Sequence, residues 1–262
     1  MRAIMIGDVV AGVGMRALLA RLPDLRERYA PDMVVVNAEN AAAGAGTSPR
    51  QAKDLLDAGV DVLTGGNHTL QKPEILTMLE TEPRMLRPAN IAVRAPGRGI
   101  TTVETAAGPV SVINVMGSVF LTAAHSPFAV IDDLVETARR AAPFVLVDIH
   151  AEATSEKIAM AHHLTGRVTA VVGTHTHVQT ADARVLGDAT AYITDLGMTG
   201  PHDSVIGVRT EIVLRRFLTS APGRFEPADG GVLVQGVVID AGPDGRATAI
   251  EAFSFPDVAS TH

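Results

Sequence analysis

The chain has 262 residues, of which 47% are hydrophobic, and this supports a sizeable core in a globular protein of enzyme size. The net charge of -7 and the presence of only three lysines exclude the basic stripe that stable binding to a nucleic-acid backbone needs. The lack of cysteine excludes disulfides and thiolate metal sites, so any metal needs oxygen and imidazole ligands.

The apolar N-terminus is not expected to be a signal peptide or a membrane anchor. Asp8 interrupts the apolar stretch and Arg16 breaks the remainder. No uncharged run in the chain approaches the roughly 18 residues needed to span a bilayer. We therefore expect a cytoplasmic protein with no membrane partner.

Short apolar runs alternate with helix-like segments along much of the chain. The strands are predicted at 2–6, 33–37, 60–64, 144–149 and 168–172. The helices are predicted at 15–29, 48–58, 73–81, 128–142 and 154–165. Such alternation is typical of βαβ units whose strands are buried on both faces, and it predicts an α/β protein.

Other segments have strand-like sequences without intervening helices. Residues 99–115 are predicted to form a hairpin with its turn at Gly108-Pro109, and further strands are predicted at 211–220, 231–240 and 246–255. These segments indicate a second sheet with antiparallel hairpins. Because no low-complexity linker or internal repeat is found, residues 1–262 are predicted to form a single domain.

Polar residues follow five of the predicted strands, just past their carboxyl ends. They are Asp8, Glu39, Asn40, Asn67, His68, His150, His175 and His177. Open α/β sheets build their sites at this edge. In VVGTHTHVQTAD at 171–182, an extended backbone would point the side chains of His175 and His177 in the same direction. Two ligands of a metal site would be arranged in this way.

Each of these residues alone also fits a structural role. Asp8 and Glu39 could cap helices, Asn67 could occupy a left-handed turn, and His150 could be a hydrogen-bonded histidine at the edge of the core. Structural roles for all of them would require acids, amides and imidazoles to gather at one edge by accident. A functional site is the better explanation.

The assortment of side chains indicates the chemistry. Two carboxylates, two amides and three imidazoles can hold two divalent transition-metal ions about 3.5 to 4 Å apart, with Glu39 as the bridge. Imidazole together with oxygen donors favours Fe or Mn, with Zn as a third option. Two such ions would clamp a phosphate and acidify a bridging water, leaving one histidine for proton transfer. We expect hydrolysis of a small anionic phosphoester.

The order of these motifs resembles that of the metallophosphoesterase superfamily, whose general pattern is Asp-x-His, Gly-Asp-x-x-Asp, Gly-Asn-His, His and Gly-His-x-His. The chain departs from this pattern at Val10, which replaces the first histidine, and at NAEN (37–40), which replaces the aspartate block. Those departures, together with the motifs GDVVAGVG, DIHAEATSEK, GTHTHVQTAD and DLGMTGPHDSVIG, are similar to the bacterial YmdB-like phosphodiesterase family over nearly the whole chain.

The resemblance implies a four-layer α/β/β/α sandwich and hydrolysis of phosphodiesters, usually 2',3'-cyclic nucleotides. It implies that one metal is bound by Asp8, Glu39, Asn40 and His177, and the other by Glu39, Asn67, His150 and His175. His68 would then donate a proton to the leaving oxygen. This agrees with the chemistry of the pair, because consecutive residues cannot both face one ion and an imidazole donates protons better than an amide.

Three further segments have weaker signals. AEATSEK at 151–157 could contact substrate, or Thr154 or Ser155 could cap the following helix. The loop MTGPHDSV at 198–205, with His202 and Asp203, is predicted to be a surface turn that could line the pocket. His162 and His163 are interpreted as structural, because adjacent residues diverge on a helix.

Two other functions stay open from the sequence. GVGMRA at 12–17 matches the dinucleotide fingerprint Gly-x-Gly-x-x-Ala, with Glu39 near the expected ribose-binding position, which would fit an NAD-type oxidoreductase. However, the first glycine stands several residues after the strand, and this function leaves the histidines unexplained. A non-catalytic metal or nucleotide sensor would use the same site. The sequence also leaves a homo-oligomer open.

Overall fold

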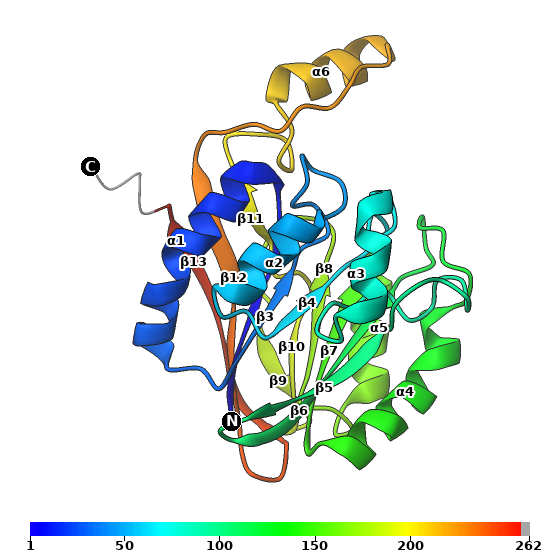
Figure 1. Ribbon diagram of the computed structural model, residues 1–262, viewed down its shortest axis with the longest axis vertical. Helices are drawn as coiled ribbons and strands as arrows, with labels where there is room; N and C mark the ends of the chain where they lie inside the picture. Colours follow the sequence, from blue (N-terminus) through cyan, green and yellow to red (C-terminus); the bar gives the residue numbers. More distant parts are fainter. Residues whose placement is uncertain (258–262) are drawn as a thin grey trace.

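The computed structural model describes residues 1–257 as two β-sheets with helices packed against them (Figure 1). The first sheet has the strand order β2-β11-β12-β1-β3-β4, and β13 pairs with β12. Its strands are β1 (Arg2–Ile6), β2 (Asp8–Val9), β3 (Met33–Asn37), β4 (Val62–Thr64), β11 (Met198–Pro201), β12 (Val232–Ala241) and β13 (Ala247–Pro256).

The second sheet has the strand order β5-β6-β7-β8-β10-β9. Its strands are β5 (Ile100–Thr105), β6 (Gly108–Met116), β7 (Phe144–His150), β8 (Ala170–Thr174), β9 (Arg184–Leu186) and β10 (Thr190–Ile193). The helices are α1 (Ala11–Tyr29), α2 (Pro49–Asp57), the 3₁₀ turn η1 (Pro73–Ile75), α3 (Leu76–Thr81), α4 (Pro127–Ala141), α5 (Thr154–Leu164) and α6 (Thr210–Thr219).

Parallel strands contribute the site-bearing ends of both sheets. In the first sheet β1, β3 and β4 run parallel, and in the second β6, β7, β8 and β10 do. Every residue of β3, β7 and β8 is buried, which explains their nearly continuous apolar sequences. The chain therefore leaves these strands at their carboxyl ends and places the residues that follow along a shared edge.

Apolar side chains form three main cores among the described residues. One joins the two sheets and includes Met5 and Leu146. Another packs the first sheet against helices α1 to α3 and includes Leu18 and Leu55, and a third packs the second sheet against α4 and α5 and includes Met160. Packing on both faces of each sheet holds the strand ends in fixed positions.

Local signals fix several helix boundaries. Ser48 accepts a hydrogen bond from the Gln51 backbone while the Gln51 side chain accepts one from the Ser48 backbone, and Pro49 opens α2. Ser126 and Pro127 start α4 in a similar way. Within residues 1–257, no helix is both long enough and apolar enough to cross a membrane.

The predicted helices and the five predicted buried strands are confirmed, with ends displaced by four residues or fewer. The strands predicted at 231–240 and 246–255 are confirmed as β12 and β13. The hairpin at 99–115 is also confirmed, but its turn is Ala106-Ala107, because Gly108 pairs with Thr105 as the first residue of β6.

The strand predicted at 211–220 is wrong, because this segment forms helix α6. Its apolar residues Val213, Leu214, Phe217 and Leu218 recur at the spacing of a helix and do not alternate as in a strand. Only Val213 of the helix is buried, and α6 projects beyond the two sheets at the top of Figure 1.

Two predictions about loops are also wrong. Ala153 occupies the position before α5 and no side chain caps this helix, so neither Thr154 nor Ser155 is an N-cap. Of the surface turn predicted at 198–205, residues 198–201 are instead the buried strand β11, because they pair with β2 and β12, whereas 202–205 form a partly exposed bend.

The glycines of the dinucleotide fingerprint lie within helix α1. Gly12 and Gly14 follow the helix start at Ala11, so no glycine-rich loop separates strand from helix as the fingerprint requires. Gly14 instead allows α1 to contact β11, because a Cβ atom there would lie 2.2 Å from the carbonyl oxygen of Thr199. A Cβ at Gly12 would meet no atom closer than Arg16 Nη1, at 3.5 Å.

We expect Gly14→Ala to destabilise the protein and Gly12→Ala not to. The methyl group at 14 would force α1 away from β11, at a cost of about 1 to 3 kcal/mol. At position 12 the same change fills open space and improves helix propensity, so the stability should stay equal or rise by at most about 1 kcal/mol. Urea denaturation of both variants measures the difference. Equal stability of the two would contradict the close packing of α1 on β11.

Candidate active site

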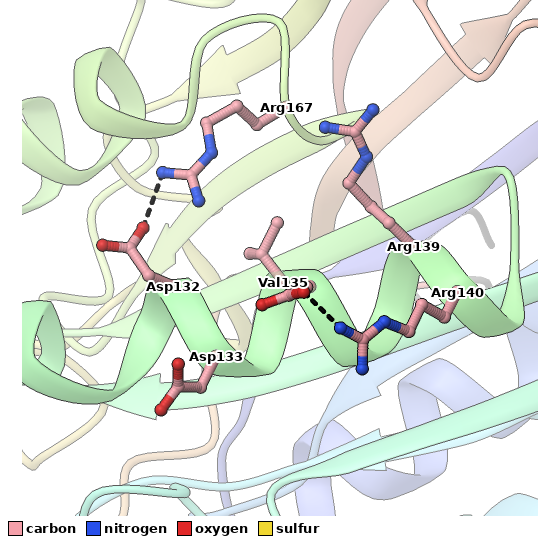
Figure 2. Close-up of a pocket in the computed structure, with 7 residues that line it drawn as sticks. Asp132, Asp133, Val135, Arg139, Arg140 and Arg167 are labelled. Carbon is pink, nitrogen blue, oxygen red and sulfur yellow. Dashed lines mark hydrogen bonds and ion pairs between the residues drawn. The ribbon is translucent and has the colours of Figure 1, made fainter.

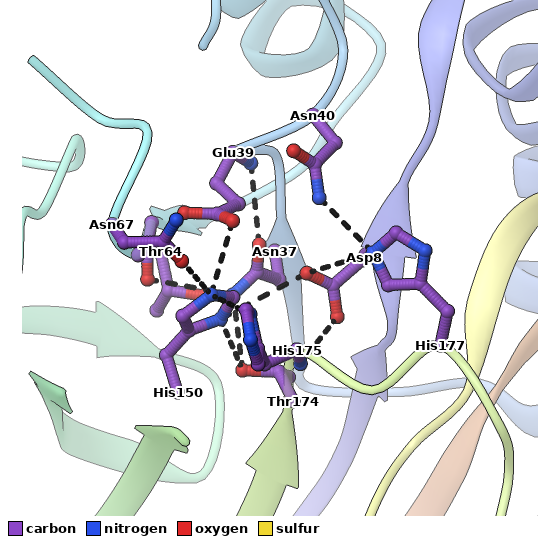
Figure 3. Close-up of polar contacts among 12 residues, drawn as sticks. Asp8, Asn37, Glu39, Asn40, Thr64, Asn67, His150, Thr174, His175 and His177 are labelled. Carbon is purple, nitrogen blue, oxygen red and sulfur yellow. Dashed lines mark hydrogen bonds and ion pairs between the residues drawn. The ribbon is translucent and has the colours of Figure 1, made fainter. Parts of the chain in front are cut away.

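Seven of the predicted site residues meet where strands of both sheets end (Figure 3). They come from segments far apart in the sequence: β2 and the segments after β3 and β4 on one side, and the end of β7 and the segment after β8 on the other. The residues are Asp8, Glu39, Asn40, Asn67, His150, His175 and His177. The sequence-based expectation that they share one place is confirmed.

The ring nitrogen Nε2 of His150 is the centre of a tight cluster. It lies 3.0 Å from Glu39 Oε1, 3.0 Å from Asn67 Oδ1 and 3.0 Å from His175 Nδ1. Glu39, His150 and His175 offer ligand atoms that all lie within 4.8 Å of one another, and Glu39 and His150 are buried. Donor atoms that converge in this way can surround one metal ion.

Asp8, Asn40 and His177 form a looser group beside this cluster. Asn40 Nδ2 lies 3.1 Å from His177 Nε2, and Asp8 Oδ1 lies 3.8 Å from the same nitrogen. The other nitrogen of His177, Nδ1, donates to the carbonyl oxygen of Ile206 at 2.8 Å. That bond leaves the Nε2 lone pair directed to the side of Asp8 and Asn40.

Gly66 lets the backbone after β4 come close to the cluster. A Cβ atom at this position would lie 2.2 Å from Glu39 Oε2 and 2.3 Å from His150 Nε2. The next residue, Asn67, turns its side chain to His150, whereas His68 lines the neighbouring cleft. The two consecutive residues therefore face different surroundings.

His68 contacts the acidic and amide groups at the edge of the cluster. Its Nδ1 lies 2.7 Å from Asn40 Oδ1 and 3.3 Å from Glu39 Oε1, and its backbone N–H donates to Glu39 Oε2 at 3.1 Å. His68 thus stands between the candidate ligands and the space where a substrate would lie.

Two buried carboxylate oxygens in the site accept no hydrogen bond, namely Asp8 Oδ1 and Glu39 Oε1. A buried carboxylate without full pairing costs free energy unless a cation neutralises it. The oxygens lie beside imidazole nitrogens in a set without cysteine. This donor set fits divalent metal ions.

The electrostatics of the site favour positive charge at its centre. Burial raises the pKa of Asp8. Burial alone would lower the pKa of His150, but the charges of Glu39, Asp8 and Asp148 outweigh it and raise the pKa to about 9. Burial and the charge of His150 lower the pKa of His175 to about 3, so His175 is neutral near pH 7 and has a lone pair to donate.

A buried polar relay fixes the orientation of His150. Thr174 Oγ1 donates to Asp148 Oδ1 at 2.7 Å, so it accepts from His150 Nδ1, which lies 3.0 Å away. Asn37 and Thr64 donate to the other oxygen of Asp148, at 3.0 and 2.5 Å. Because Nδ1 carries the proton in this relay, Nε2 is left for the cluster.

These supporting residues were not predicted from the sequence. Asn37, Thr64, Asp148 and Thr174 lie within or at the ends of strands that are otherwise apolar. A polar residue within a fully buried strand needs a partner, and that requirement was the available signal. Two further residues line the cleft. Glu152 lies in AEATSEK at 151–157, which the sequence indicated as a possible substrate contact, whereas Phe225 lies in a loop that had no such signal.

The backbone between His175 and His177 is not extended, so the geometric reason given for their convergence is wrong. His175 has φ +101° and His177 has φ +64°, both in the left-handed region. Both imidazoles reach the site because separate elements bind the turn: Asp8 Oδ2 accepts the His175 backbone N–H at 3.0 Å, and Ile206 accepts from His177. Tertiary contacts override the local alternation here.

A cleft of about 470 Å³ opens over the cluster. Polar groups of Glu39, Asn40, His68, His175 and His177 line one part of it. Another part is apolar, with Val10, Ile206, Val208, Phe225 and Pro227. The predicted loop residues His202 and Asp203 do not line this cleft, but the adjoining segment 206–208 does.

A second hollow lies over helix α4 and is lined by Asp132, Arg139, Arg140 and Arg167 among others (Figure 2). Four of its charged residues form ion pairs: Arg167 binds Asp132 at 2.6 Å, and Arg140 binds Glu136. His163 also contacts Asp132 there, at 2.9 Å. The structural interpretation of His163 agrees with this position outside the cluster.

Comparisons with known proteins show relatives over nearly the whole chain. The 2',3'-cyclic-nucleotide 2'-phosphodiesterase of Bacillus subtilis (strain 168) is 45% identical over 240 residues, covering 92% of this chain and 91% of that protein. The crystal structure of a hypothetical protein from Thermus thermophilus has 42% sequence identity and a TM-score of 0.92, covering 98% of this chain and 100% of that one.

A more distant structure shows the fold alone. The 5'-nucleotidase precursor from Thermus thermophilus is 13% identical with a TM-score of 0.57, and the match covers 99% of this chain and 55% of that one. The family described as YmdB-like protein matches residues 4–253. With this match and with a relative at 45% identity, the chain belongs to the YmdB-like family.

Proposed function

We propose that this protein is a metal-dependent phosphodiesterase that hydrolyses 2',3'-cyclic nucleotides with two divalent transition-metal ions bound in the cluster. The observation that carries this proposal is the pair of buried oxygens Asp8 Oδ1 and Glu39 Oε1, which accept no hydrogen bond and lie among imidazole nitrogens, with Glu39 lining an open cleft. When bound there, two metal ions would neutralise the phosphate charge and acidify water. The named activity of the Bacillus subtilis relative supports the substrate class.

One ion would be held by Glu39, Asn67, His150 and His175. The three contacts of 3.0 Å around His150 Nε2 support this set, since each of these atoms can donate a lone pair to a common centre. The other ion would be held by Asp8, Glu39, Asn40 and His177. Glu39 is placed in both sets because its Oε1 lies 3.0 Å from His150 Nε2 and its charge is close enough to raise the pKa of Asp8.

Fe or Mn is the proposed metal, with Zn as a third option. Three imidazoles favour borderline transition metals, while two carboxylates and two amide oxygens favour Mn over softer ions. The absence of cysteine from the sequence removes the thiolate ligands that would favour Zn in a structural site.

Asn40 links metal binding to the proton donor. To bind a metal beside His177, its amide must turn by half a rotation so that Oδ1 takes the place of Nδ2. The amide nitrogen would then face His68 Nδ1, where Oδ1 stands now, and donate to it. His68 would carry its proton on Nε2 and transfer it to the leaving oxygen.

The cleft suits a nucleoside cyclic phosphate. The polar floor would take the phosphate, and the apolar wall of Ile206, Val208, Phe225 and Pro227 would take the base. Phe225 offers a phenyl face in this lining, and Arg216 stands over its ring at 5.0 Å from the centroid. Because stacking on an aromatic ring tolerates every base, we propose that the enzyme discriminates little between bases.

The fold implied by this function is the four-layer α/β/β/α sandwich, and we propose that it forms a single domain. The three cores described above support the layers, since one joins the sheets and the others join each sheet to its helices.

We expect Glu39→Gln to lose both metal ions and Asp8→Asn to lose mainly one. Glu39 serves both sets, whereas Asp8 serves one. Metal analysis of the purified variants by mass spectrometry measures this against about two ions per chain in the wild type. Glu136→Gln, which changes an exposed acid on α4, is the matched control and should keep both. If Glu39→Gln and Asp8→Asn lose the same single ion, Glu39 is not a bridge. A metal-free wild type with full activity would refute the metal proposal.

We expect His68→Ala to keep its metal and to lose activity in a way that depends on the leaving group. Loss of a general acid typically costs about 10² to 10⁴ in rate, and less when the leaving group is already a stable anion. The variant should therefore lose more on a nucleoside cyclic phosphate than on a nitrophenyl phosphodiester. His162→Ala, on the surface of α5, is the control. Loss of metal would make His68 a ligand, and equal losses on both esters would indicate a role in phosphate binding.

We expect Phe225→Ala to raise KM for the cyclic phosphates of all four nucleosides by about 5- to 100-fold, the range that loss of one base stack predicts. Glycerol 1,2-cyclic phosphate has no base, so its KM should not change. Phe225→Tyr should restore binding, and Phe217→Ala tests whether any exposed aromatic residue of this segment matters. A KM increase for the base-free substrate would contradict the stacking role.

A further inference from the structure

Two motifs singled out in the sequence have residues that the proposed chemistry does not use. Lys157 comes from DIHAEATSEK and lies on α5, and Asp195 comes from DLGMTG and follows β10. Their side chains form an ion pair of 2.7 Å in which both are 0% exposed. Lys157 is thus a buried lysine in a chain that has only three lysines.

Asp195 connects this pair to the active site through Thr176. Its Oδ2 accepts hydrogen bonds from Lys157 Nζ at 2.7 Å, from the Thr176 backbone at 3.1 Å and from Thr176 Oγ1 at 2.7 Å. Its Oδ1 accepts from the backbone of Gly197 at 2.8 Å. Thr176 is the residue between His175 and His177, so the ion pair binds the middle of the turn that bears both imidazoles.

The turn at residues 175–177 needs stabilising contacts of this kind. Non-glycine residues with positive φ are unfavourable, and they persist only where surrounding contacts impose the conformation. His175 and His177 both have positive φ, and their imidazoles go to different partners: His175 to the His150 cluster and His177 to the side of Asp8 and Asn40. A relaxed turn would place the two rings differently.

Burial of an ion pair is an expensive way to stabilise a core, because apolar side chains of similar volume often do as well or better. The ion pair instead fixes the orientation of groups near the site. The charge of Lys157 holds the Asp195 carboxylate in place, and that carboxylate binds both the backbone amide and the hydroxyl of Thr176. Charge-assisted hydrogen bonds of this kind fix geometry more strictly than apolar packing.

We propose that Lys157 and Asp195 are positioning residues that hold Thr176, so that His175 and His177 each face their own metal ion. The statement about the metal ions rests on the proposed function. The statement about the turn does not, because it concerns the hydrogen bonds of Thr176 alone.

The test compares Lys157→Met with Lys53→Met in the full-length protein. Lys53 forms an exposed ion pair with Asp57, at 2.6 Å, so the control removes the same charge from the surface. The first measurement is amide hydrogen exchange at Thr176 after metal is removed with a chelator. The second is the affinity for Mn²⁺, followed by electron paramagnetic resonance. Lys157→Met should speed the exchange of Thr176 and weaken Mn²⁺ binding by about 10- to 100-fold, as loss of support behind a metal ligand does.

A second pair of variants covers the case in which Lys157→Met does not fold. Thr176→Val removes the hydroxyl bond to Asp195 without leaving a buried charge unpaired, and it should weaken Mn²⁺ binding. Thr176→Ser keeps the hydroxyl and should restore wild-type binding. Thermal unfolding of each metal-free variant separates this effect from a general loss of stability.

Unchanged Thr176 exchange and unchanged Mn²⁺ affinity in Lys157→Met would overturn the proposal. So would equal Mn²⁺ affinity in Thr176→Val and Thr176→Ser if Lys157→Met is unfolded. A wild type that binds none of Mn²⁺, Fe²⁺ and Zn²⁺, with exchange at Thr176 still faster in Lys157→Met, would refute the proposed function and leave the positioning role of the pair standing.

Discussion

The burial of the Asp8 and Glu39 carboxylates at the junction of two sheets is the constraint on which the site depends. Each has an oxygen without a hydrogen-bond partner, at a place where water cannot easily solvate it. Such groups are retained in a fold when a positive charge accompanies them or when they take up a proton. The fold supplies that charge in part through His150, whose pKa rises to about 9 beside the two acids. A divalent cation would meet the same demand more completely.

The surrounding structure keeps these charges in place because the neighbouring polar groups form hydrogen bonds with one another. His150 donates to Thr174, Thr174 donates to Asp148, and Asn37 and Thr64 complete the partners of Asp148. Burial raises the pKa of Asp148 to about 6, and the hydrogen bonds limit that rise. Because the ends of strands from both sheets contribute to the relay, the packing of the sheets and the tautomer of His150 depend on each other.

Much of this arrangement could be predicted from the sequence because strand ends and polar residues coincide along the chain. The apolar runs at 33–37 and 144–149 located strands correctly, and the residues after them met as expected. Contacts between segments far apart in the chain could not be predicted from the sequence. The turn at His175 and His177 adopts positive φ because Asp8 and Asp195 bind it from other elements. The strand predicted at 211–220 is helix α6, whose apolar residues have helical spacing.

The molecule therefore buries charge in two ways that serve different ends. Asp8 and Glu39 each keep an oxygen that accepts no hydrogen bond, so this oxygen can bind a cation. Asp195 has its charge matched by Lys157 and its remaining capacity taken by Thr176 and Gly197, so nothing is left for a metal. A buried acid whose hydrogen bonds are complete serves to position other residues. One whose hydrogen bonds are incomplete can serve as a metal ligand. The hydrogen bonds of each carboxylate distinguish the positioning role from the ligand role, whereas composition and burial alone do not.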